Sequence, residues 1–316
     1  MSRNRALLLG FASLLSLAAC ATEVSTDELA AEGANDAAAA DAAEGGKADS
    51  TGQYTYFLVT PDMRRCASPK CGGFWVDRIN LGTTKCADGT YAEKCYVAEL
   101  NLDGTGLPTA STDTVIGQAH SATSQVLLRG TIAKKSFGAN GTLGVFKATE
   151  AWLPTTDAPA DGVFVKLKDA GVRCITTPCP STHELKLNSS SKAVIADVDF
   201  SWSGATDEQI AAAVGAEFGD GLIIAGDRYT VHGQAGNGKA RTATQLWTKV
   251  LGPCFVGGCS GQICSDEEGV ISTCIYKPEY ACYHNDSTAC ERQTNGACEW
   301  TQTDALLACL ADPPTP

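Results

Sequence analysis

The strongest constraint on the fold is a unit that occurs twice in the centre of the chain, over residues 54–154 and again over 162–251. Each copy contains an Arg-Cys-(x4)-Cys motif, at Arg65–Cys71 and at Arg173–Cys179. Further similar segments occur in the same order: 57–59 and 163–165 before the motif, and after it 75–80 and 183–188, 97–102 and 195–200, 127–130 and 223–226, and 148–152 and 243–247. Chance does not readily produce so many matches in one order, so we expect two related domains in tandem.

The pattern within each copy predicts three strands, then a helix or a loop, then two more strands. The clearest alternation of apolar and polar residues, which is typical of half-buried strands, lies at 193–200 and 222–232. This order predicts an OB-like Greek-key barrel in each copy, and another small α+β sandwich stays open as the alternative. The expected class is therefore mainly β (α+β), and Trp152 and Trp247 are expected to seal the two cores.

One helix is predicted in the second copy, at 207–218. Thr206 and Gln209 have the spacing of a capping box, and Gly219 marks the end of the helix. The apolar residues fall on one helical face, which we expect to face the core. They are Ile210, Val214 and Phe218.

The first 19 residues predict a lipoprotein signal peptide, with an apolar stretch from Ala6 to Ala19 that is shorter than the roughly 20 residues of a transmembrane helix. The stretch ends in Leu17-Ala18-Ala19-Cys20, which resembles the bacterial lipobox. The resemblance implies lipidation of Cys20, stable anchoring by two or three acyl chains and, because no Asp follows Cys20, the outer membrane. An ordinary signal peptide that is cut elsewhere is the alternative. Residues 20–53 lack a periodic apolar pattern and predict an acidic disordered tether.

The charges of the chain exclude one class of partner and point to no other. The formal net charge is −12, whereas a protein that binds duplex nucleic acid needs clustered Lys and Arg. Residues 51–253 carry 19 charges of each sign, so the central body offers no broad field that would steer a charged ligand. We therefore expect no nucleic acid among the partners.

Export to an oxidising compartment predicts that the 15 cysteines, apart from the lipidated Cys20, form disulfides. If the two copies fold alike, each motif must close within its own copy, which pairs Cys66 with Cys71 and Cys174 with Cys179. The first copy also carries an insertion, in which Cys86 and Cys95 then pair. A metal site is disfavoured, because structural zinc sites usually bring their cysteines in CxxC pairs.

Residues 254–312 predict a third, small domain that disulfides hold together, because so short a segment buries little apolar surface. A helix is predicted at 304–310, with Leu306, Leu307 and Cys309 facing inward. Eight cysteines allow 105 connectivities, and spacing does not choose among them. A zinc cluster that includes His284 is the minority alternative. The eight cysteines are Cys254, Cys259, Cys264, Cys274, Cys282, Cys290, Cys298 and Cys309.

Two segments resemble known families. Residues 254–310, with Gly258-Cys259-Ser260-Gly261-Gln262-Ile263-Cys264 and Cys298-Glu299-Trp300-Thr301, resemble the eight-cysteine-cluster domain of prokaryotic exported proteins. Residues 54–103, with Arg64-Arg65-Cys66-Ala67-Ser68-Pro69-Lys70-Cys71-Gly72-Gly73-Phe74-Trp75-Val76, resemble a domain of unknown function from myxobacterial lipoproteins. The resemblances imply location and architecture, and neither implies an activity.

No catalytic motif stands out in the sequence. The nucleophile elbow, the HExxH motif and the phosphate-binding loop are absent. His120, His183 and His232 have no recognisable partner, and Asp197 and Asp199 share one face of a strand, where a solvated face is favoured over a carboxylate pair or a calcium site. We therefore expect no catalytic residue, no metal and no cofactor.

The expected function is non-catalytic binding by an envelope-anchored lipoprotein. An envelope protein, a polysaccharide or a neighbouring cell is the expected partner. Exposed aromatic residues of the tail, Tyr280, Tyr283 and Trp300, are candidates for an interface. An exported protease inhibitor that uses residues 254–316 is the first alternative. A hydrolase that uses the histidines or the aspartate pair is the second.

Overall fold

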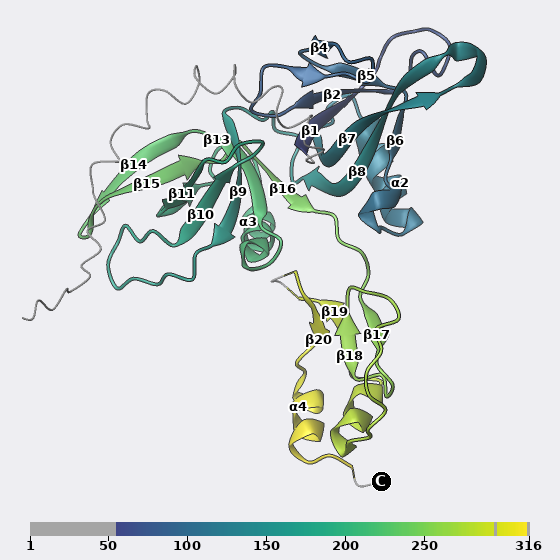
Figure 1. The fold of residues 1–316 in the computed structure, drawn as a ribbon. Helices are drawn as coiled ribbons and strands as arrows, with labels where there is room; N and C mark the ends of the chain where they lie inside the picture. The colour runs from purple at the N-terminus through teal and green to yellow at the C-terminus, as the bar shows by residue number, and fades with distance from the viewer. Residues whose placement is uncertain (1–54, 294–295, 315–316) are drawn as a thin grey trace, which may run out of the picture. The chain divides into compact units, whose positions relative to one another are not determined.

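A computed structural model describes residues 55–293 and 296–314 of the chain (Figure 1). The predicted signal peptide, the lipidation site Cys20 and the tether at 20–53 lie outside these residues. Among the helices that the structure describes, none is long and apolar enough to cross a bilayer. The described chain is mainly β, with a strongly curled antiparallel sheet, few helices and a C-terminal disulfide-rich region, which confirms the predicted fold class.

The first copy forms a closed sheet, in which the path of paired strands starts and ends at β1. β1 pairs with β2 and β7, β2 pairs with β5, and β7 pairs with β8, all antiparallel. β6 lies one residue beyond β5 and pairs with β8 in parallel, which closes the path. With β5 and β6 taken as one broken strand, this is the five-strand order expected of an OB-like barrel. The elements are β1 (Thr55–Pro61), β2 (Phe74–Arg78), β5 (Cys95–Val97), β6 (Glu99–Asn101), α2 (Thr109–Ala119), β7 (Val126–Ser136) and β8 (Thr142–Pro154).

The second copy repeats this pairing, but its last two strands are each divided into two. β13 and β14 together correspond to β7, and β15 and β16 together correspond to β8. β9 pairs with β10 and β13, β10 pairs with β11, and β12 pairs in parallel with β15. The elements are β9 (Val163–Asp169), β10 (Thr182–Lys186), β11 (Lys192–Ile195), β12 (Asp197–Asp199), α3 (Asp207–Gly215), η4 (Ala216–Phe218), β13 (Leu222–Gly226), β14 (Arg228–Gly233), β15 (Gly236–Thr242) and β16 (Gln245–Lys249).

The two copies join through β8 and β16, which pair antiparallel and make one continuous sheet. Its order is β11-β10-β9-β13-β16-β8-β7-β1-β2-β5, so the second half repeats the first in reverse. Trp152 and Trp247 are fully buried, and they share one apolar cluster with Ile79, Leu187 and Ile223. Each tryptophan was expected to seal its own core. Instead both of them pack at the joint between the copies.

The helices test the expectation in two places. The second copy has its capped helix, in which Thr206 accepts a bond from the backbone of Gln209, but Phe218 at the end of the predicted apolar face is 58% exposed. The first copy has an equivalent helix, α2, at the place where the pattern left a helix or a loop open. Its buried face consists of Val115 and Ala119 alone, so tertiary packing rather than an amphipathic stripe holds it.

An insertion in the first copy forms a small hairpin, β3 (Thr84–Lys85) and β4 (Tyr91–Ala92). Three disulfides lie in the two copies, and each closes a local loop. They join Cys66 to Cys71, Cys86 to Cys95 and Cys174 to Cys179.

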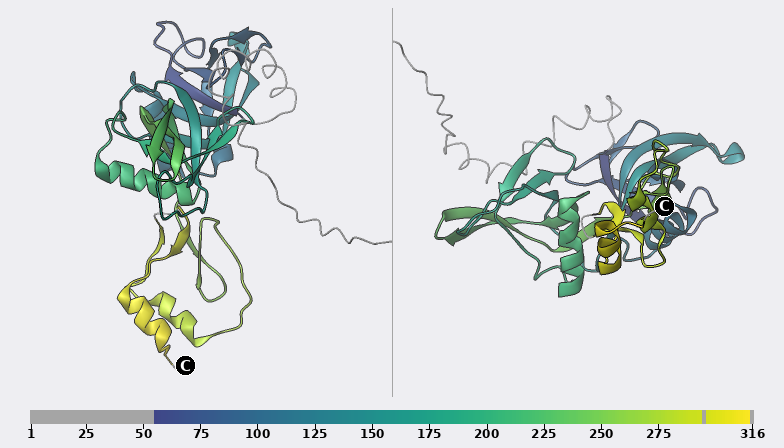
Figure 2. Two further views of the ribbon diagram at one scale, coloured as in Figure 1. Left: turned by 90° about the vertical axis from the view of Figure 1, so that its left-hand side faces the viewer. Right: turned by 90° about the horizontal axis from the view of Figure 1, so that it is seen from below.

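The C-terminal module consists of two short hairpins and two helical segments, and η5 and α4 lie side by side (Figure 2). Its elements are β17 (Phe255–Gly257), β18 (Ile263–Ser265), η5 (Pro278–His284), β19 (Cys290–Arg292), β20 (Cys298–Trp300) and α4 (Asp304–Ala311). Four disulfides join Cys254 to Cys298, Cys259 to Cys274, Cys264 to Cys290 and Cys282 to Cys309. Leu306 is fully buried, whereas Leu307, expected to face inward, is 48% exposed.

Candidate binding groove

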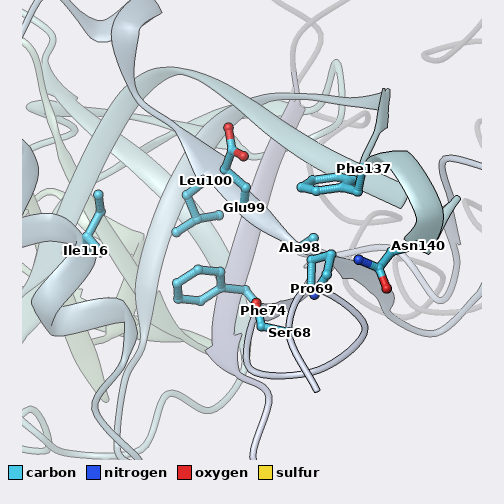
Figure 3. A pocket seen from close by; sticks show the side chains of 9 residues that line it. All are labelled: Ser68, Pro69, Phe74, Ala98, Glu99, Leu100, Ile116, Phe137 and Asn140. Atoms are coloured by element: carbon cyan, nitrogen blue, oxygen red, sulfur yellow. The ribbon is translucent and has the colours of Figure 1, made fainter. Parts of the chain in front are cut away.

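A groove of about 520 Å³ opens in the first copy, between the loop that joins β1 to β2 and the turn that joins β7 to β8 (Figure 3). Its volume lies within the range of about 300–1,000 Å³ that is usual for ligand pockets. Phe74, Leu100 and Ile116 lie together at one end, and Phe137, Pro69 and Asn140 lie at the other. Ser68, Ala98 and Glu99 complete the lining. Polar and apolar atoms thus contribute about equally to the exposed lining of the groove.

The β1–β2 loop forms one wall of the groove, and several bonds fix its position. The Cys66–Cys71 disulfide closes it, and the hydroxyl of Tyr96 donates to the carbonyl of Pro69 at 2.7 Å. Because this loop is held at both places, the wall is preformed.

Asp62 and Arg64 anchor the start of the same loop. The guanidinium of Arg64 lies against two rings, 4.8 Å from the centre of Trp75 and 4.9 Å from that of Tyr96. It also donates to the carboxylate of Asp62, whose side chain is fully buried. This bond from Arg64 holds the pKa of Asp62 below its usual value. Arg64 and Asp62 therefore hold the start of the loop in shape.

The β7–β8 turn forms the opposite wall and carries Phe137. Its backbone needs glycine, because Gly138 and Gly141 have φ angles of 62° and 83°. The Nζ atom of Lys135 lies 5.5 Å from the ring centre of Phe137 and forms an ion pair with Glu99 across the groove edge, at 2.6 Å. The turn thus presents an aromatic ring beside a paired carboxylate.

The second copy fills the corresponding space with its own loop. The backbone N–H of Ala235, at the tip of the β14–β15 hairpin, donates to the carbonyl of Thr177 in the β9–β10 loop at 2.9 Å. A Cβ atom added to Gly238 would lie 2.6 Å from Pro178 and 3.2 Å from Ala196, the equivalent of a lining residue in the first copy. The hairpin therefore needs glycine so that the loop can lie on it. The two copies share a fold, but the groove is open in the first.

The copies also differ in their cores. Arg241 donates to both carboxylate oxygens of Glu184, at 2.6 and 3.0 Å, and Arg228 donates to the same carboxylate at 2.8 Å. Burial raises the pKa of Glu184, but the two arginines outweigh it and lower the pKa overall. The strand registers place three apolar residues at the equivalent positions of the first copy: Val76, Ile132 and Phe146. The second copy therefore has a triad of charged residues at the place where the first copy has apolar residues.

A second polar cluster lies at the joint of the copies. The carboxylate of Glu150 accepts bonds from Tyr56, Trp152 and Arg129, at 3.2, 3.1 and 2.7 Å. The Nζ atom of Lys166 lies 4.8 Å from the ring centre of Trp152. Burial lowers the pKa of Lys166 to about 8 and raises that of Tyr56. Both carboxylate oxygens of Glu150 already accept hydrogen bonds from the protein. We therefore assign the cluster a structural role at the joint between the copies rather than a role in ligand binding.

The histidines and aspartates of the sequence do not converge on one site. His120 follows α2 in the first copy, where its ring packs on Phe74 with centroids 4.6 Å apart. His183 lies on β10 and His232 on β14, and His232 is hydrogen bonded to Asn237. Within the residues that the structure describes, no group of three His, Cys, Asp or Glu side chains is placed to hold a metal.

The aspartate pair lies on β12, with Asp197 exposed and Asp199 half-buried. Asp199 accepts a bond from the backbone of Ser201 at 2.9 Å, and bonds from Ser201 lower its pKa. Sequence reasoning missed the groove instead. Only the β7–β8 turn, where two glycines follow Phe137, marks it locally in the sequence.

Two family models match the chain. Residues 55–253 match a family described as a domain of unknown function (DUF6748), so the match spans both copies and more than half of the chain. Residues 248–314 match the model of the CGP-CTERM domain protein, which covers the disulfide-rich module. No curated protein and no solved structure matches. The predicted resemblance to a domain of unknown function with a cysteine-rich C-terminal module is thus confirmed, and the chain belongs to the DUF6748 family.

Proposed function

We propose that this protein is an envelope lipoprotein, anchored by lipid on Cys20 to the outer membrane, that binds a polysaccharide chain without cleaving it. The binding site in this proposal is the groove of the first copy. The observation that carries it is the position of the groove on the fold, since OB-like barrels bind oligosaccharides and oligonucleotides on this face and with these two loops.

The chemistry of the groove favours a sugar over a nucleic acid. Its lining mixes polar and apolar surface about equally, as the surface of a sugar does: the ring of Phe137 suits the C–H face of a pyranose, and Ser68 and Asn140 can bond its hydroxyl groups. A backbone of phosphates would need several cations, whereas the lining has none of its own and Lys135 is already paired with Glu99. A neutral glycan is the ligand class that fits best.

The same lining supports binding rather than hydrolysis. Glycosidases generally place two carboxyl groups on either side of the bond that they cleave. Glu99 is the one acidic residue among the lining residues, and Lys135 holds it in an ion pair. The proposal is therefore recognition of a glycan, with the chain left intact.

Titration calorimetry with the full chain in detergent tests the groove. The probes are neutral soluble oligosaccharides from chitin, cellulose and mannan. Wild type should bind at least one of them, and Phe137→Ala should weaken that binding about tenfold or more, because an aromatic anchor is lost. Phe218→Ala is the matched control, since Phe218 is an exposed phenylalanine of the second copy. No binding at about millimolar ligand, or equal losses in both variants, would refute the proposal.

Metabolic labelling tests the anchor separately. Cells that express the chain and are fed a radiolabelled fatty acid should label wild type and should leave Cys20→Ser unlabelled. A labelled Cys20→Ser variant, or an unlabelled wild type, would refute lipid anchoring through Cys20. Neither result would bear on glycan binding by the groove.

A further inference from the structure

The C-terminal module contains a stretch of six consecutive exposed residues, Thr273–Pro278, which follows β18 and ends at the first residue of η5. Ile275 and Tyr276 lie at its centre, with 68% and 53% of their surfaces exposed. Two adjacent large apolar side chains in solvent offer a contiguous apolar surface to a partner. Nothing within the described part of the chain covers them.

Both ends of this stretch are fixed. On one side, the Cys259–Cys274 disulfide joins it to the β17–β18 hairpin. Just before it, the hydroxyl of Ser272 accepts bonds from the backbone of Cys259 at 3.0 Å and from Gln262 at 2.6 Å. On the other side, Pro278 begins η5, which the Cys282–Cys309 disulfide joins to α4. The stretch is therefore held in place without being covered.

The backbone between these anchors is open. Residues 270–277 form neither a helix, a turn nor a paired strand, and Lys277 has extended dihedral angles of φ −130° and ψ 142°. In the described chain, no backbone hydrogen bond involves Ile275 or Tyr276. Their N–H and C=O groups are free to pair with another strand, and the exposed side chains are free to enter pockets, which is how extended peptides are recognised.

We propose that Thr273–Pro278 is a preformed docking strand that occupies the active-site cleft of an endopeptidase and inhibits it. Endopeptidases take their substrates extended, with main-chain bonds on both sides of a side-chain pocket, and an apolar pocket fits Ile275 or Tyr276. A strand that is already ordered loses little entropy on binding.

The disulfides give the second reason for this class of partner. If an enzyme cut the bond between Ile275 and Tyr276, the Cys254–Cys298 and Cys264–Cys290 disulfides would still join the two pieces. Each new end would also stay attached close to its original place, through Cys259–Cys274 on one side and Cys282–Cys309 on the other. A cut chain would therefore keep the cleft filled, as an inhibitor must.

Inhibition kinetics with the full chain test the proposal against serine, cysteine and aspartic endopeptidases that prefer aliphatic or aromatic residues. At least one enzyme should be inhibited at about 10 µM or below. Ile275→Asp or Tyr276→Asp should raise the inhibition constant about tenfold or more, because a charge enters an apolar pocket. Ile271→Asp is the matched control, since Ile271 is 89% exposed and lies outside the stretch. Its inhibition constant should not change.

Three results would overturn the proposal. The first is that no enzyme of the panel is inhibited. The second is that all three variants inhibit as wild type does. The third is rapid cleavage at Ile275–Tyr276 with full loss of inhibition, which would make the stretch a substrate. Glycan binding by the groove involves other residues, so its success or failure does not bear on this outcome.

Discussion

Asn80 and Asn188 occupy equivalent positions in the two copies, and each bonds the first strand of the other copy. The side-chain amide of Asn80 donates to the carbonyl of Phe164 at 2.7 Å and accepts from its N–H at 2.9 Å. Asn188 makes the same pair of bonds with Tyr56, both at 2.8 Å. Both asparagines have positive φ angles, 61° and 57°, which asparagine tolerates better than most residues.

Replacement of either asparagine should loosen the joint of the copies. Asn80→Ala removes both bonds with Phe164 and a third bond, from the amide to the carbonyl of Leu187 at 3.0 Å. It also leaves alanine at a positive φ angle, so we expect a loss of about 2–4 kcal/mol in the free energy of unfolding. Asn80→Gly keeps the backbone relaxed and should lose less, by about 1 kcal/mol. Urea denaturation measures both variants. Asn140→Ala, at an exposed position, is the control, and an Asn80→Ala variant as stable as this control would contradict the role of the amide.

The ion triad of the second copy should be replaceable as a set but not one residue at a time. Glu184→Val alone leaves two arginines facing each other in a core, and we expect it to cost about 3–5 kcal/mol. The triple change Glu184→Val, Arg228→Ile and Arg241→Phe installs the residues of the first copy, and it should restore the free energy of unfolding to that of wild type or above. Chemical denaturation of the single and triple variants decides this. A triple variant less stable than Glu184→Val would show that the two cores are not equivalent.

Much of this architecture follows from the sequence for a physical reason. Repeated units fold alike, so the strand order and the closure of each Arg-Cys-(x4)-Cys loop within its own copy follow from one pattern read twice. The helix α2 does not follow, because its three Thr, one Ser and one Gly are poor helix formers, and packing of Val115, Ile116 and Ala119 on the core stabilises it.

The groove and the joint escape sequence reasoning for a different reason. Phe74, Ile116 and Phe137 line one groove but come from a strand, a helix and a turn that are far apart along the chain. Whether a groove stays open depends on small differences, such as Pro178 lying against Gly238 in the second copy. The repeat pattern does not contain such differences, and they decide which copy has an open groove.

Glu217 should make the stability of the protein depend on pH. Burial raises the pKa of its carboxyl from the usual value of 4.5 to about 7, and the charge of Asp169 adds to this. The folded state therefore holds a proton that the unfolded state has lost, so stability falls as pH rises from about 4.5 to 7 and then levels off. Glu217→Gln, which stays neutral, should match wild type near pH 4 and exceed it by about 1–2 kcal/mol near pH 8. Thermal unfolding at both pH values measures the difference, and a constant difference would contradict the assignment. Glu208→Gln, an exposed neighbour on α3, is the control.

Reduction of the disulfides should destabilise the C-terminal module much more than the central sheet. In the described chain after Cys254, the fully buried apolar residues are Cys282 and Leu306, so the module has almost no core of its own. Its four disulfides close spans of 44, 15, 26 and 27 residues, and each typically contributes about 2–4 kcal/mol. The central sheet instead buries Trp152, Trp247 and the strands around them. Hydrogen exchange read by mass spectrometry should show that dithiothreitol strips protection from residues 254–314 and leaves β7, β8 and β16 protected. If the module keeps its protection when all its thiols are free, packing rather than crosslinks holds it. The docking strand would then survive in a reducing compartment as well.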